Sequence, residues 1–381
     1  MLEIAREFLK LGATAYGGPA IMGIMQAELQ GRRQWVSRAR FLEGLSIANL
    51  LPGATATQLA IFLGHARGGF LGGLVAGLAF MLPGFAIILA LTVGYAALGM
   101  TPVLRHALYG LGPVVIAIYA VAVYRLGASA VRSVPQVLIG IAAAAVTFSG
   151  AAGVTATLLL AGAVGILLFH SRRFGALVLA LLVVGLLTVR RFATAVPVVD
   201  GAPHPPTLGG LTLFLLEVGA LTFGGGLSMI AFIQEQLVRQ WQWLTPQEFI
   251  DGLALGQLTP GPVLTVAAYV GFKTFGMTGA VVGTAAAFLP SFVLMLAILP
   301  ALERVRQLTW AKAAMNGIGP AVIGALAVSL ARLVPHAVPD AFAAVVLIAS
   351  LVVLTVRRVG IFTMLFAGGA LGVLRKAYAW R

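Results

Sequence analysis

Charged residues are scarce in this sequence: Asp, Glu, Lys and Arg make up 9% of the 381 residues, whereas 60% are hydrophobic and the mean hydropathy is +1.02. A water-soluble domain carries about a quarter charged residues, so a soluble globule is excluded. A helix needs about 20 apolar residues to cross a bilayer, and this length allows on the order of a dozen crossings. The sequence therefore predicts an all-α, multi-pass membrane protein with little mass outside the bilayer.

Cysteine is absent, which excludes disulfides, iron–sulfur clusters and thiolate metal sites. The five histidines are scattered, and no HExxH motif, paired-carboxylate motif or glycine-rich phosphate loop occurs. We therefore expect no enzymatic activity, no metal and no cofactor. Any driving force has to come from an ion gradient, from the membrane potential or from a separate subunit.

Acidic residues are also few, because 11 Asp and Glu stand against 25 Lys and Arg, a formal net charge of +14. In a soluble domain this excess would suggest nucleic acid. Here many cations stand singly or in pairs between apolar segments, as Arg32-Arg33 and Arg172-Arg173 do. Cations at such places anchor loops and set topology. The sequence predicts the lipid bilayer as a partner and no nucleic acid.

One stretch, 191–208, is too proline-rich and polar to lie in lipid, and we interpret it as a linker. It separates a first unit with its connecting segment (1–190) from a second unit (209–381). The candidate membrane segments on its two sides are 8–29, 41–65, 69–98, 103–124, 134–149, 151–169 and 174–189, then 209–237, 247–272, 275–301, 309–331, 338–355 and 359–374.

The strongest signal in the sequence is internal repetition. Glycines, prolines and aromatic residues recur in order after about 207 residues, which indicates a duplicated helical unit. An odd number of crossings between equivalent positions would turn the second copy upside down, as in many transporters. The fold class predicted is therefore two homologous helical repeats, inverted, with broken helices. The pairs include Gly12 and Gly219, Pro52 and Pro260, Pro83 and Pro290, Pro113 and Pro320, and Arg125 and Arg332.

Three apolar segments in each copy are interrupted by proline or glycine. Proline lacks a backbone donor and glycine permits a turn, so each interruption can split a helix. One break alone would favour a structural kink, but recurrence in both copies favours a shared function. The pairs of interruptions are Tyr16-Gly17-Gly18-Pro19 and Phe223-Gly224-Gly225-Gly226, Asn49-Leu50-Leu51-Pro52-Gly53 and Gln257-Leu258-Thr259-Pro260-Gly261-Pro262, and Leu82-Pro83-Gly84 and Leu289-Pro290-Ser291.

A helix that starts inside the bilayer exposes unpaired N–H groups, for which lipid offers no partner. The helix dipole adds about half a positive charge there, so two such ends form a cradle for an anion. Nearby hydroxyls and amides suit a tetrahedral dianion; alternatively, each hydroxyl bonds its own preceding carbonyl. The predicted substrate-binding residues at the breaks are Tyr16, Gly17, Gly18, Asn49, Pro52, Gly53, Thr55, Thr57, Gln58, Phe223, Gly224, Gly225, Gln257, Thr259, Pro260, Gly261 and Thr265.

Several charged residues stand at equivalent positions of the two copies. Arg105 aligns with Lys312, and we add both to the candidate substrate site, with snorkelling to the interface as the alternative. Glu28 aligns with Glu235 and could relay a proton, with a helix-end salt bridge as the alternative. Glu217 aligns with a lysine and is costly within a span. Glu28, Glu235 and Glu217 are the candidates for coupling.

Three motifs of the first copy give the chain a resemblance to the chromate ion transporter family of the long, two-domain type: Tyr16-Gly17-Gly18-Pro19, Arg33-Gln34-Trp35-Val36-Ser37, and Leu50-Leu51-Pro52-Gly53 with Thr57-Gln58-Leu59-Ala60. The second copy is similar to that family's C-terminal half at Phe223-Gly224-Gly225 and at 257–262. The ordered combination is far more specific than any one motif. One departure concerns the first copy, where family members continue with Pro and then Glu or Asn, whereas Ala54 and Thr55 stand here.

The resemblance implies an inner-membrane protein that exports chromate by using the proton motive force, with sulfate as a competing oxyanion. We expect alternating access around one midplane site. Sulfate or another anion as substrate, uptake instead of export, an anion channel and a non-transporting scaffold remain open, and so does a homodimer. Carried over by position, the family's functional motifs fall on Gly17, Gly18, Pro19, Pro52 and Gly53 and on Gly224, Gly225, Pro260, Gly261 and Pro262.

Overall fold

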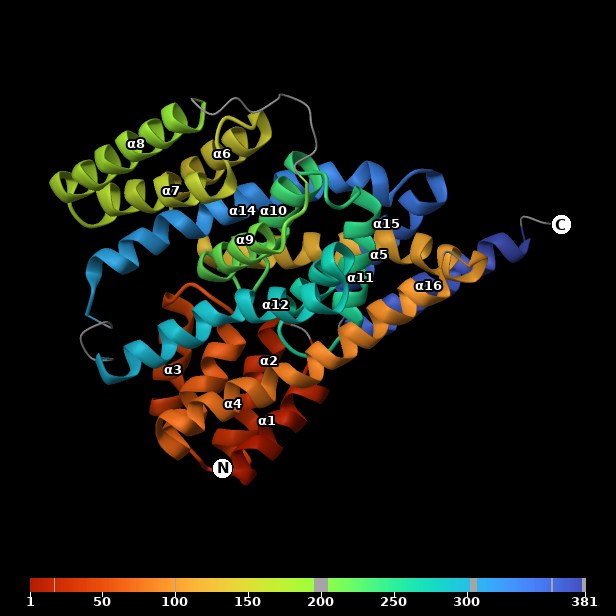
Figure 1. Cartoon of the computed structure of the whole chain (residues 1–381), viewed down its shortest axis with the longest axis horizontal. Helices are drawn as coiled ribbons and strands as arrows, with labels where there is room; N and C mark the ends of the chain where they lie inside the picture. The colour runs from red at the N-terminus through yellow and green to blue at the C-terminus, as the bar shows by residue number, and fades with distance from the viewer. Residues whose placement is uncertain (17, 100, 195–204, 302–306, 358, 379–381) are drawn as a thin grey trace.

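The computed structural model describes residues 1–16, 18–99, 101–194, 205–301, 307–357 and 359–378, without the side chains of 18–20, 98, 189–194 and 376–378. All regular structure in these ranges is helical, as predicted (Figure 1). The helices are α1 (Leu2–Thr14), α2 (Gly18–Met25), η1 (Gln26–Arg32), α3 (Arg38–Leu50), α4 (Thr55–Leu98), α5 (Pro102–Ala130), α6 (Val134–Ser149), α7 (Val154–Phe169), α8 (Arg172–Thr194), α9 (Leu208–Ala220), α10 (Met229–Ile233), η2 (Gln234–Gln240), α11 (Pro246–Leu258), η3 (Val263–Thr265), α12 (Val266–Ile298), η4 (Leu299–Ala301), α14 (Thr309–Ala337), α15 (Ala341–Val356) and α16 (Ile361–Tyr378).

The helices repeat in order, with α8 between the copies. Backbone details repeat as well: α4 turns sharply at Gly68 and Gly69, and α12 turns at Phe275 and Gly276. The second residue of each pair has a positive φ, 63° and 60°, which favours glycine. The predicted duplication of an all-helical unit is confirmed. The equivalent helices are α1 and α9, α3 and α11, α4 and α12, α5 and α14, α6 and α15, and α7 and α16.

The apolar segments 41–65 and 247–272 are helical hairpins and not single spans. A Cβ on Gly44 of α3 would lie 2.3 Å from the Phe62 ring of α4, although a continuous helix would separate these residues by about 27 Å. The same approach joins Gly252 to Tyr269 in the second copy. The chain therefore enters the molecule along α3 or α11, turns at the Pro–Gly break and returns, so these two candidate segments are re-entrant and do not each cross once.

The segments 8–29 and 209–237 fold back in the same way. Arg33, which follows η1, forms an ion pair of 2.5 Å with Glu7 in the middle of α1. In the second copy the Phe214 ring of α9 lies 5.7 Å from the Trp241 ring just after η2. Each copy thus contains two hairpins, with one tip at residues 15–16 or 221–226 and the other at 51–54 or 259–262.

The third predicted break is wrong in both copies. Pro83 lies inside α4 and Pro290 inside α12, and neither helix is interrupted at its proline. A proline removes one backbone hydrogen bond, but a membrane helix tolerates this loss when neighbouring groups satisfy the freed carbonyl. The sharp turns of these helices instead occur at the Gly68-Gly69 and Phe275-Gly276 pairs.

The two copies exchange their C-terminal hairpins. α6 and α7 of the first copy pack against α14 of the second, and α15 and α16 pack against α5 of the first. Arg332 of α14 donates to the carbonyl of Thr147 at 2.9 Å, and the equivalent Arg125 of α5 donates to Leu354 at 3.1 Å. These donors cap carbonyls that no further turn of helix would satisfy. The copies are therefore interlocked and do not form two separate bodies.

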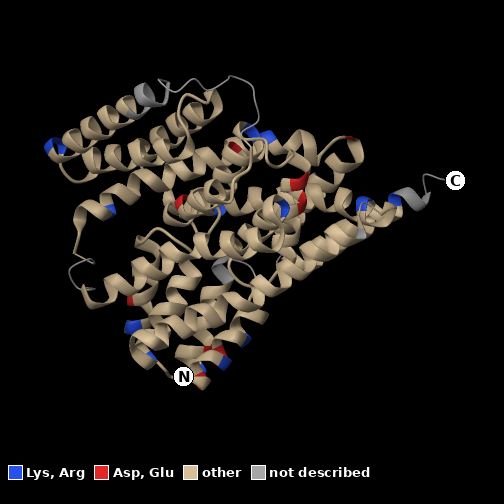
Figure 2. Ribbon diagram, in the orientation of Figure 1, with Lys and Arg blue, Asp and Glu red and all other residues tan. Residues whose placement is uncertain are grey.

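Among the described residues, four helices are long and apolar enough to cross a membrane: Thr55–Ala97, Pro102–Ala130, Val263–Ala301 and Thr309–Ala337. Figure 2 shows long stretches of helix without a charged residue. Ten consecutive residues of α5, Gly110 to Tyr119, are buried, as expected of a central helix that is apolar all round. α5 and α14 run antiparallel, because Gly112 lies against Ala337 and Gly127 against Ile323.

Candidate functional site

The tips of the hairpins meet between the two copies. The Gly53 N–H of the first copy donates to the Thr222 carbonyl of the second at 2.7 Å. The Gly261 N–H of the second copy donates to the Ala15 carbonyl of the first at 2.9 Å. Thr222 and Ala15 are equivalent positions, and so are Gly53 and Gly261. The Pro–Gly breaks that the sequence singled out therefore lie together at a centre to which both copies contribute.

The long helices close this centre from the other copy. The hydroxyl of Ser291, next to Pro290 in α12, accepts a hydrogen bond of 2.8 Å from the Ala54 N–H. At the equivalent place in α4, a Cβ on Gly84 would lie 2.7 Å from the Pro260 carbonyl oxygen. The small residue after each proline thus lets one copy's helix touch the hairpin tip of the other. Ser291 was not among the predicted site residues, although its pairing with Gly84 in the repeat was a usable signal.

The start of α4 offers an anion several donors. The first backbone bond of this helix runs from the Gln58 N–H to the Ala54 carbonyl, so the N–H groups of residues 55–57 precede it. Ala54 supplies no side-chain cap. Among the described side chains, the Thr57 hydroxyl and the Gln58 Oε1 atom are buried without a hydrogen-bond partner, whereas Gln58 Nε2 donates to the Pro52 carbonyl at 2.7 Å. Unpaired donors at a helix N-terminus are suited to a negative charge.

The second break does not offer the same set. The Thr259 hydroxyl donates to the Leu255 carbonyl at 2.8 Å and the Thr265 hydroxyl to the Pro262 carbonyl at 2.9 Å. Both donors are used locally, which is the alternative that the sequence left open. The turn η3 intervenes before α12 begins. The two halves of the centre are therefore chemically different, and the first copy carries the richer donor set.

The other predicted residues of the first-segment tips are Tyr16, Gly17 and Gly18 in one copy and Phe223, Gly224 and Gly225 in the other. Gly224 and Gly225 have φ of 67° and 71°, and the Ser228 hydroxyl accepts from the Phe223 N–H at 2.8 Å, so this tip is a tight turn. Gly17 lies outside the described residues, and of Gly18 only the backbone is described, as the first residue of α2. Tyr16 is partly exposed, and its ring lies 6.2 Å from Phe362.

A buried tyrosine that sequence reasoning missed lies beside Gln257. Tyr119 of α5 is fully buried, and its hydroxyl has no hydrogen-bond partner of good geometry in the described part of the chain. Gln257, near the end of α11, is the polar side chain that approaches it. An unpaired hydroxyl at this depth is a second potential donor to an anion. The sequence signal was the hydroxyl of this tyrosine within the otherwise apolar stretch 111–123 of α5.

Two cavities lie at equivalent places of the two copies, and we call them the wide and the narrow cavity. The wide cavity, about 610 Å³, lies between α3 and the start of α14. The narrow cavity, about 180 Å³, lies between the starts of α5 and α11 and the end of α14. The wide cavity is lined by Ala39, Leu42, Glu43, Ser46, Ile47, Asn49, Leu50, Lys312, Met315 and Asn316, and the narrow one by Arg105, Leu108, Tyr109, Gly112, Gln247, Asp251, His336, Ala337 and Pro339.

The cavities lie at opposite ends of a membrane-spanning helix. Lys312 lines the wide cavity and His336 the narrow one, and 24 residues of helix correspond to about 36 Å, more than the apolar thickness of a bilayer. Arg105 and Lys312 therefore do not share one midplane site, and this part of the prediction is wrong. Equivalent residues of inverted copies that lie far from the midplane face opposite sides of the membrane, so Arg105 and Lys312 line different cavities.

The extent of the two cavities also differs. The wide cavity follows α3 as far as Asn49 and Leu50, just before the Pro52-Gly53 tip. The lining of the narrow cavity along α11 reaches only Asp251, about two turns short of the second tip. In this conformation the centre is approached from the Lys312 side.

Cysteine labelling tests this placement, because the chain has no native cysteine. We expect Ser46→Cys, in the wide cavity, and Gln247→Cys, in the narrow one, to react with a membrane-impermeant maleimide added to opposite sides of oriented vesicles. Because the native chain contains no thiol, wild-type protein serves as the blank. Labelling of both variants from the same side would contradict the assignment of the cavities to opposite faces.

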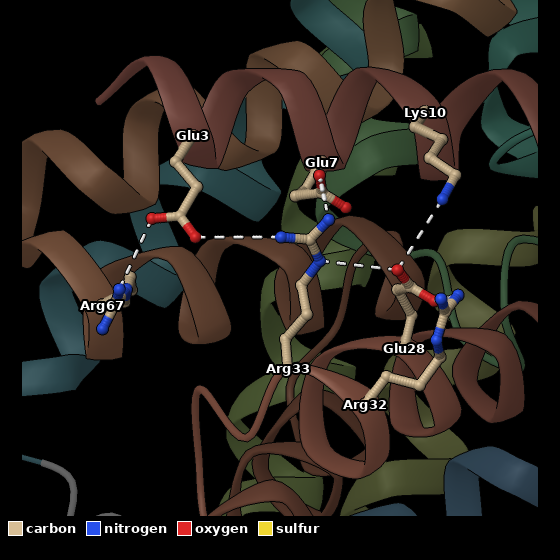
Figure 3. A network of polar contacts seen from close by, with 7 residues as sticks. All are labelled: Glu3, Glu7, Lys10, Glu28, Arg32, Arg33 and Arg67. Atoms are coloured by element: carbon tan, nitrogen blue, oxygen red, sulfur yellow. Dashed lines mark hydrogen bonds and ion pairs between the residues drawn. The ribbon is translucent and has the colours of Figure 1, made fainter.

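Glu28, one of the three coupling candidates, belongs to an ion-pair network at the open end of the first hairpin. Figure 3 shows Arg33 between Glu7 and Glu28, at 2.5 and 3.4 Å. Arg32 and Lys10 also contact Glu28, at 3.0 and 3.7 Å. Burial alone would raise the pKa of Glu28, but Arg32 and Lys10 outweigh it and lower this pKa below its ordinary value. The geometry favours the salt bridge over proton transfer.

The other two coupling candidates lie on the second copy. Glu235 is buried and pairs with Arg332 at 2.8 Å and Arg239 at 3.2 Å, so its charge is also compensated. Glu217 accepts a short hydrogen bond from Thr155 and lines a cavity of about 230 Å³ together with Glu235. None of the residues that line this cavity belongs to a hairpin tip.

Comparison with known proteins decides the family. The model of the chromate transporter family matches residues 2–196 and 210–373. The chain belongs to the chromate transporter family. The "Chromate transport protein" of Cupriavidus metallidurans is 30% identical over 97% of this chain and 91% of its own length, and that of Pseudomonas aeruginosa is 33% identical over 89% and 83%. The "Probable chromate transport protein" of Synechococcus elongatus is 34% identical over 85% and 82%. No solved structure matches the chain.

Membership confirms the resemblance drawn from the tip motifs. A chromate transporter family member is a multi-pass integral membrane protein and not an enzyme, in agreement with the spans described above. The two matched segments correspond to the two copies, and the gap between them, 197–209, overlaps the predicted linker 191–208. Residues 195–204 of that linker lie outside the described part of the chain.

Proposed function

We propose that this chromate transporter family member is a secondary active transporter that exports chromate by alternating access around the hairpin tips. The observation that carries the proposal is the reciprocal pair of hydrogen bonds from Gly53 to Thr222 and from Gly261 to Ala15. These bonds make the centre a joint of the two copies, so a rocking of one copy against the other acts directly on it. The family and the named relatives supply chromate as the substrate.

The chain's own residues suggest a path. An oxyanion enters the wide cavity, where Lys312 attracts it, and moves along α3 past Asn49 to the start of α4. There the N–H groups of residues 55–57 and the Thr57 hydroxyl replace its water. Rocking then opens the narrow cavity, where Arg105 takes the equivalent place. These donors bond to the oxygen atoms of the anion and do not distinguish its central atom, so sulfate competes with chromate.

The proton motive force sets the direction in this proposal. Each charge that crosses a membrane potential of 100 mV gains about 2.3 kcal/mol, so a dianion leaving a negative interior gains about 4.6 kcal/mol. Export of chromate is thus favoured by the electrical part of the force. Uptake of sulfate or another oxyanion through the same path would need more than one accompanying proton to offset this charge.

Flux measurements in vesicles test the proposal. Purified protein in proteoliposomes is expected to show saturable chromate flux that a protonophore or a collapse of the potential reduces. Unlabelled sulfate should compete, and molybdate and phosphate rank the selectivity. Empty vesicles are the control. Flux that does not saturate and greatly exceeds carrier rates would favour an anion channel, and a preference for sulfate over chromate would favour the alternative substrate.

A further inference from the structure

Tyr95 joins the two copies at the inner end of the narrow cavity. It belongs to α4 of the first copy, and its hydroxyl donates to a carboxylate oxygen of Asp251 in α11 of the second copy, at 3.0 Å. Gln247 of α11 donates to the other carboxylate oxygen, also at 3.0 Å. Asp251 is 1% exposed and Tyr95 is 9% exposed. Because the narrow cavity reaches no further along α11 than Asp251, the bond from Tyr95 crosses between the copies where that cavity ends.

The wide cavity continues beyond the equivalent level. Ile47 of α3 lines it, and the residue of α11 equivalent to Ile47 is Leu255, one turn beyond Asp251. Leu255 is buried and does not line the narrow cavity. Alternating access requires contacts between the moving parts that exist on the closed side and separate when that side opens. The bond between Tyr95 and Asp251 lies at the place of such a contact.

The second copy also holds the Tyr95 ring. The Lys273 ammonium lies 5.9 Å from the centre of this ring, and the Tyr269 ring lies at 6.4 Å, edge on. Lys273 in turn pairs with Glu248 of α11 at 2.8 Å. The groups around the tyrosine thus belong to one unit of α11 and α12, whereas the tyrosine comes from α4. A displacement of α4 against this unit would break the hydrogen bond to Asp251 and the cation–π contact together.

We propose that the hydrogen bond between Tyr95 and Asp251 is a latch, which keeps the narrow cavity closed while the wide cavity is open and breaks when the copies rock. This inference rests on the proposed function, because it requires that the copies move against each other. A hydrogen bond between a buried hydroxyl and a carboxyl group is stronger than one exposed to water. The latch therefore favours the conformation described here, and its loss shifts the equilibrium about 10-fold toward the conformation in which the narrow cavity is open.

Cysteine labelling measures how often the narrow cavity opens. Leu255→Cys introduces a single thiol into the full-length chain, and this thiol is buried while the latch is closed. In oriented vesicles, a membrane-impermeant maleimide added to the narrow-cavity side is expected to label it only in the opened conformation. While that conformation is the minor one, the labelling rate is proportional to its population. Tyr95→Phe, which removes only the hydroxyl, should raise this rate about 10-fold, and the labelling rate of Ser46→Cys in the wide cavity should not rise.

Tyr269→Phe is the matched control. The Tyr269 hydroxyl donates to the Glu248 carbonyl at 2.7 Å, so this bond joins α12 to α11 within the second copy. The substitution removes a buried hydroxyl beside Tyr95 without breaking a bond between the copies. We expect it to leave the labelling rate of Leu255→Cys unchanged, because loosened local packing alone does not move α4 against α11.

A second variant tests the bond from its other end. Asp251→Leu keeps a side chain of similar size without an acceptor, so it should raise the labelling rate of Leu255→Cys as Tyr95→Phe does. Adding Tyr95→Phe to it should then change the rate little, since the bond is already lost. The latch is overturned if Tyr95→Phe leaves the labelling of Leu255→Cys unchanged, if it raises the labelling of Ser46→Cys equally, or if Tyr269→Phe has the same effect. The labelling needs no substrate, so its outcome is separate from the flux measurement that tests the proposed function.

Discussion

Gly53→Ala is expected to reduce oxyanion flux by about 100-fold, the effect that a misplacement on the order of 1 Å has on a preorganised site. Gly53 has φ of 131°, a conformation that residues with a Cβ rarely adopt. An added Cβ would also lie 2.6 Å from both Gln58 Nε2 and Ser291 Oγ. Relief of this contact displaces the start of α4 from α12. The measurement is chromate flux in vesicles, normalised to the amount of inserted protein.

Two glycines serve as controls for this substitution. Gly261 is the equivalent residue, with φ of 95°, but the atoms nearest to an added Cβ are 3.6 and 3.9 Å away. Gly261→Ala therefore carries the backbone strain without the clash, and we expect a smaller loss of flux. Gly94→Ala, in α4 with nothing within 4 Å of the new Cβ, should behave as wild type. A Gly53→Ala protein as active as Gly94→Ala would show that the tip does not hold the anion.

The repeat and the interruptions could be predicted from the sequence, because both depend on glycines and prolines that recur at a fixed spacing. It could not tell a broken span from a hairpin, since about 25 apolar residues satisfy lipid equally well in either form. The contacts that distinguish a hairpin from a broken span are Gly44 with Phe62 and Gly252 with Tyr269. Both are tertiary contacts, so they are known only from the folded structure.

The proline positions show how a correct signal led to a wrong local structure. Pro52 and Pro83 look alike in sequence, yet the chain turns only at Pro52, where a glycine with positive φ follows. Gly84 follows Pro83 inside a continuous helix, where its missing side chain gives room to the Pro260 carbonyl. The same dipeptide therefore serves as a turn in one place and as a packing surface in the other.

The positions of the charged residues depend on the topology of the repeat and not on their neighbours in the sequence. In an inverted repeat only equivalent residues near the midplane can meet, and Arg105 and Lys312, near the starts of α5 and α14, line separate cavities. Glu28 and Glu235 attracted attention because they align, but both are neutralised by arginines. Asp251 was not among the predicted site residues, because nothing in the sequence shows that Tyr95, 156 residues earlier, lies against it.

Glycine-to-alanine substitutions where the exchanged hairpins cross are expected to destabilise the whole protein. A Cβ on Gly317 of α14 would lie 2.0 Å from the Ala161 carbonyl oxygen of α7, and one on Gly110 of α5 would lie 2.1 Å from the Gly368 carbonyl oxygen of α16. Backbone atoms cannot move aside as flexible side chains do, so the helices must separate. Overpacking of this kind costs about 3 kcal/mol per site. Thermal unfolding of each variant in detergent, followed by loss of monodisperse protein, measures the effect.

The double variant distinguishes interlocked copies from independent ones. Gly317 and Gly110 lie near opposite ends of the antiparallel helices α5 and α14, so their effects on the free energy of unfolding should add. Because each crossing joins the two copies, we also expect both single variants to unfold in one transition and not in two. Gly185→Ala in α8, where nothing lies within 4 Å of the new Cβ, is the matched control. A variant in which one copy melts while the other stays folded would contradict the exchange of hairpins.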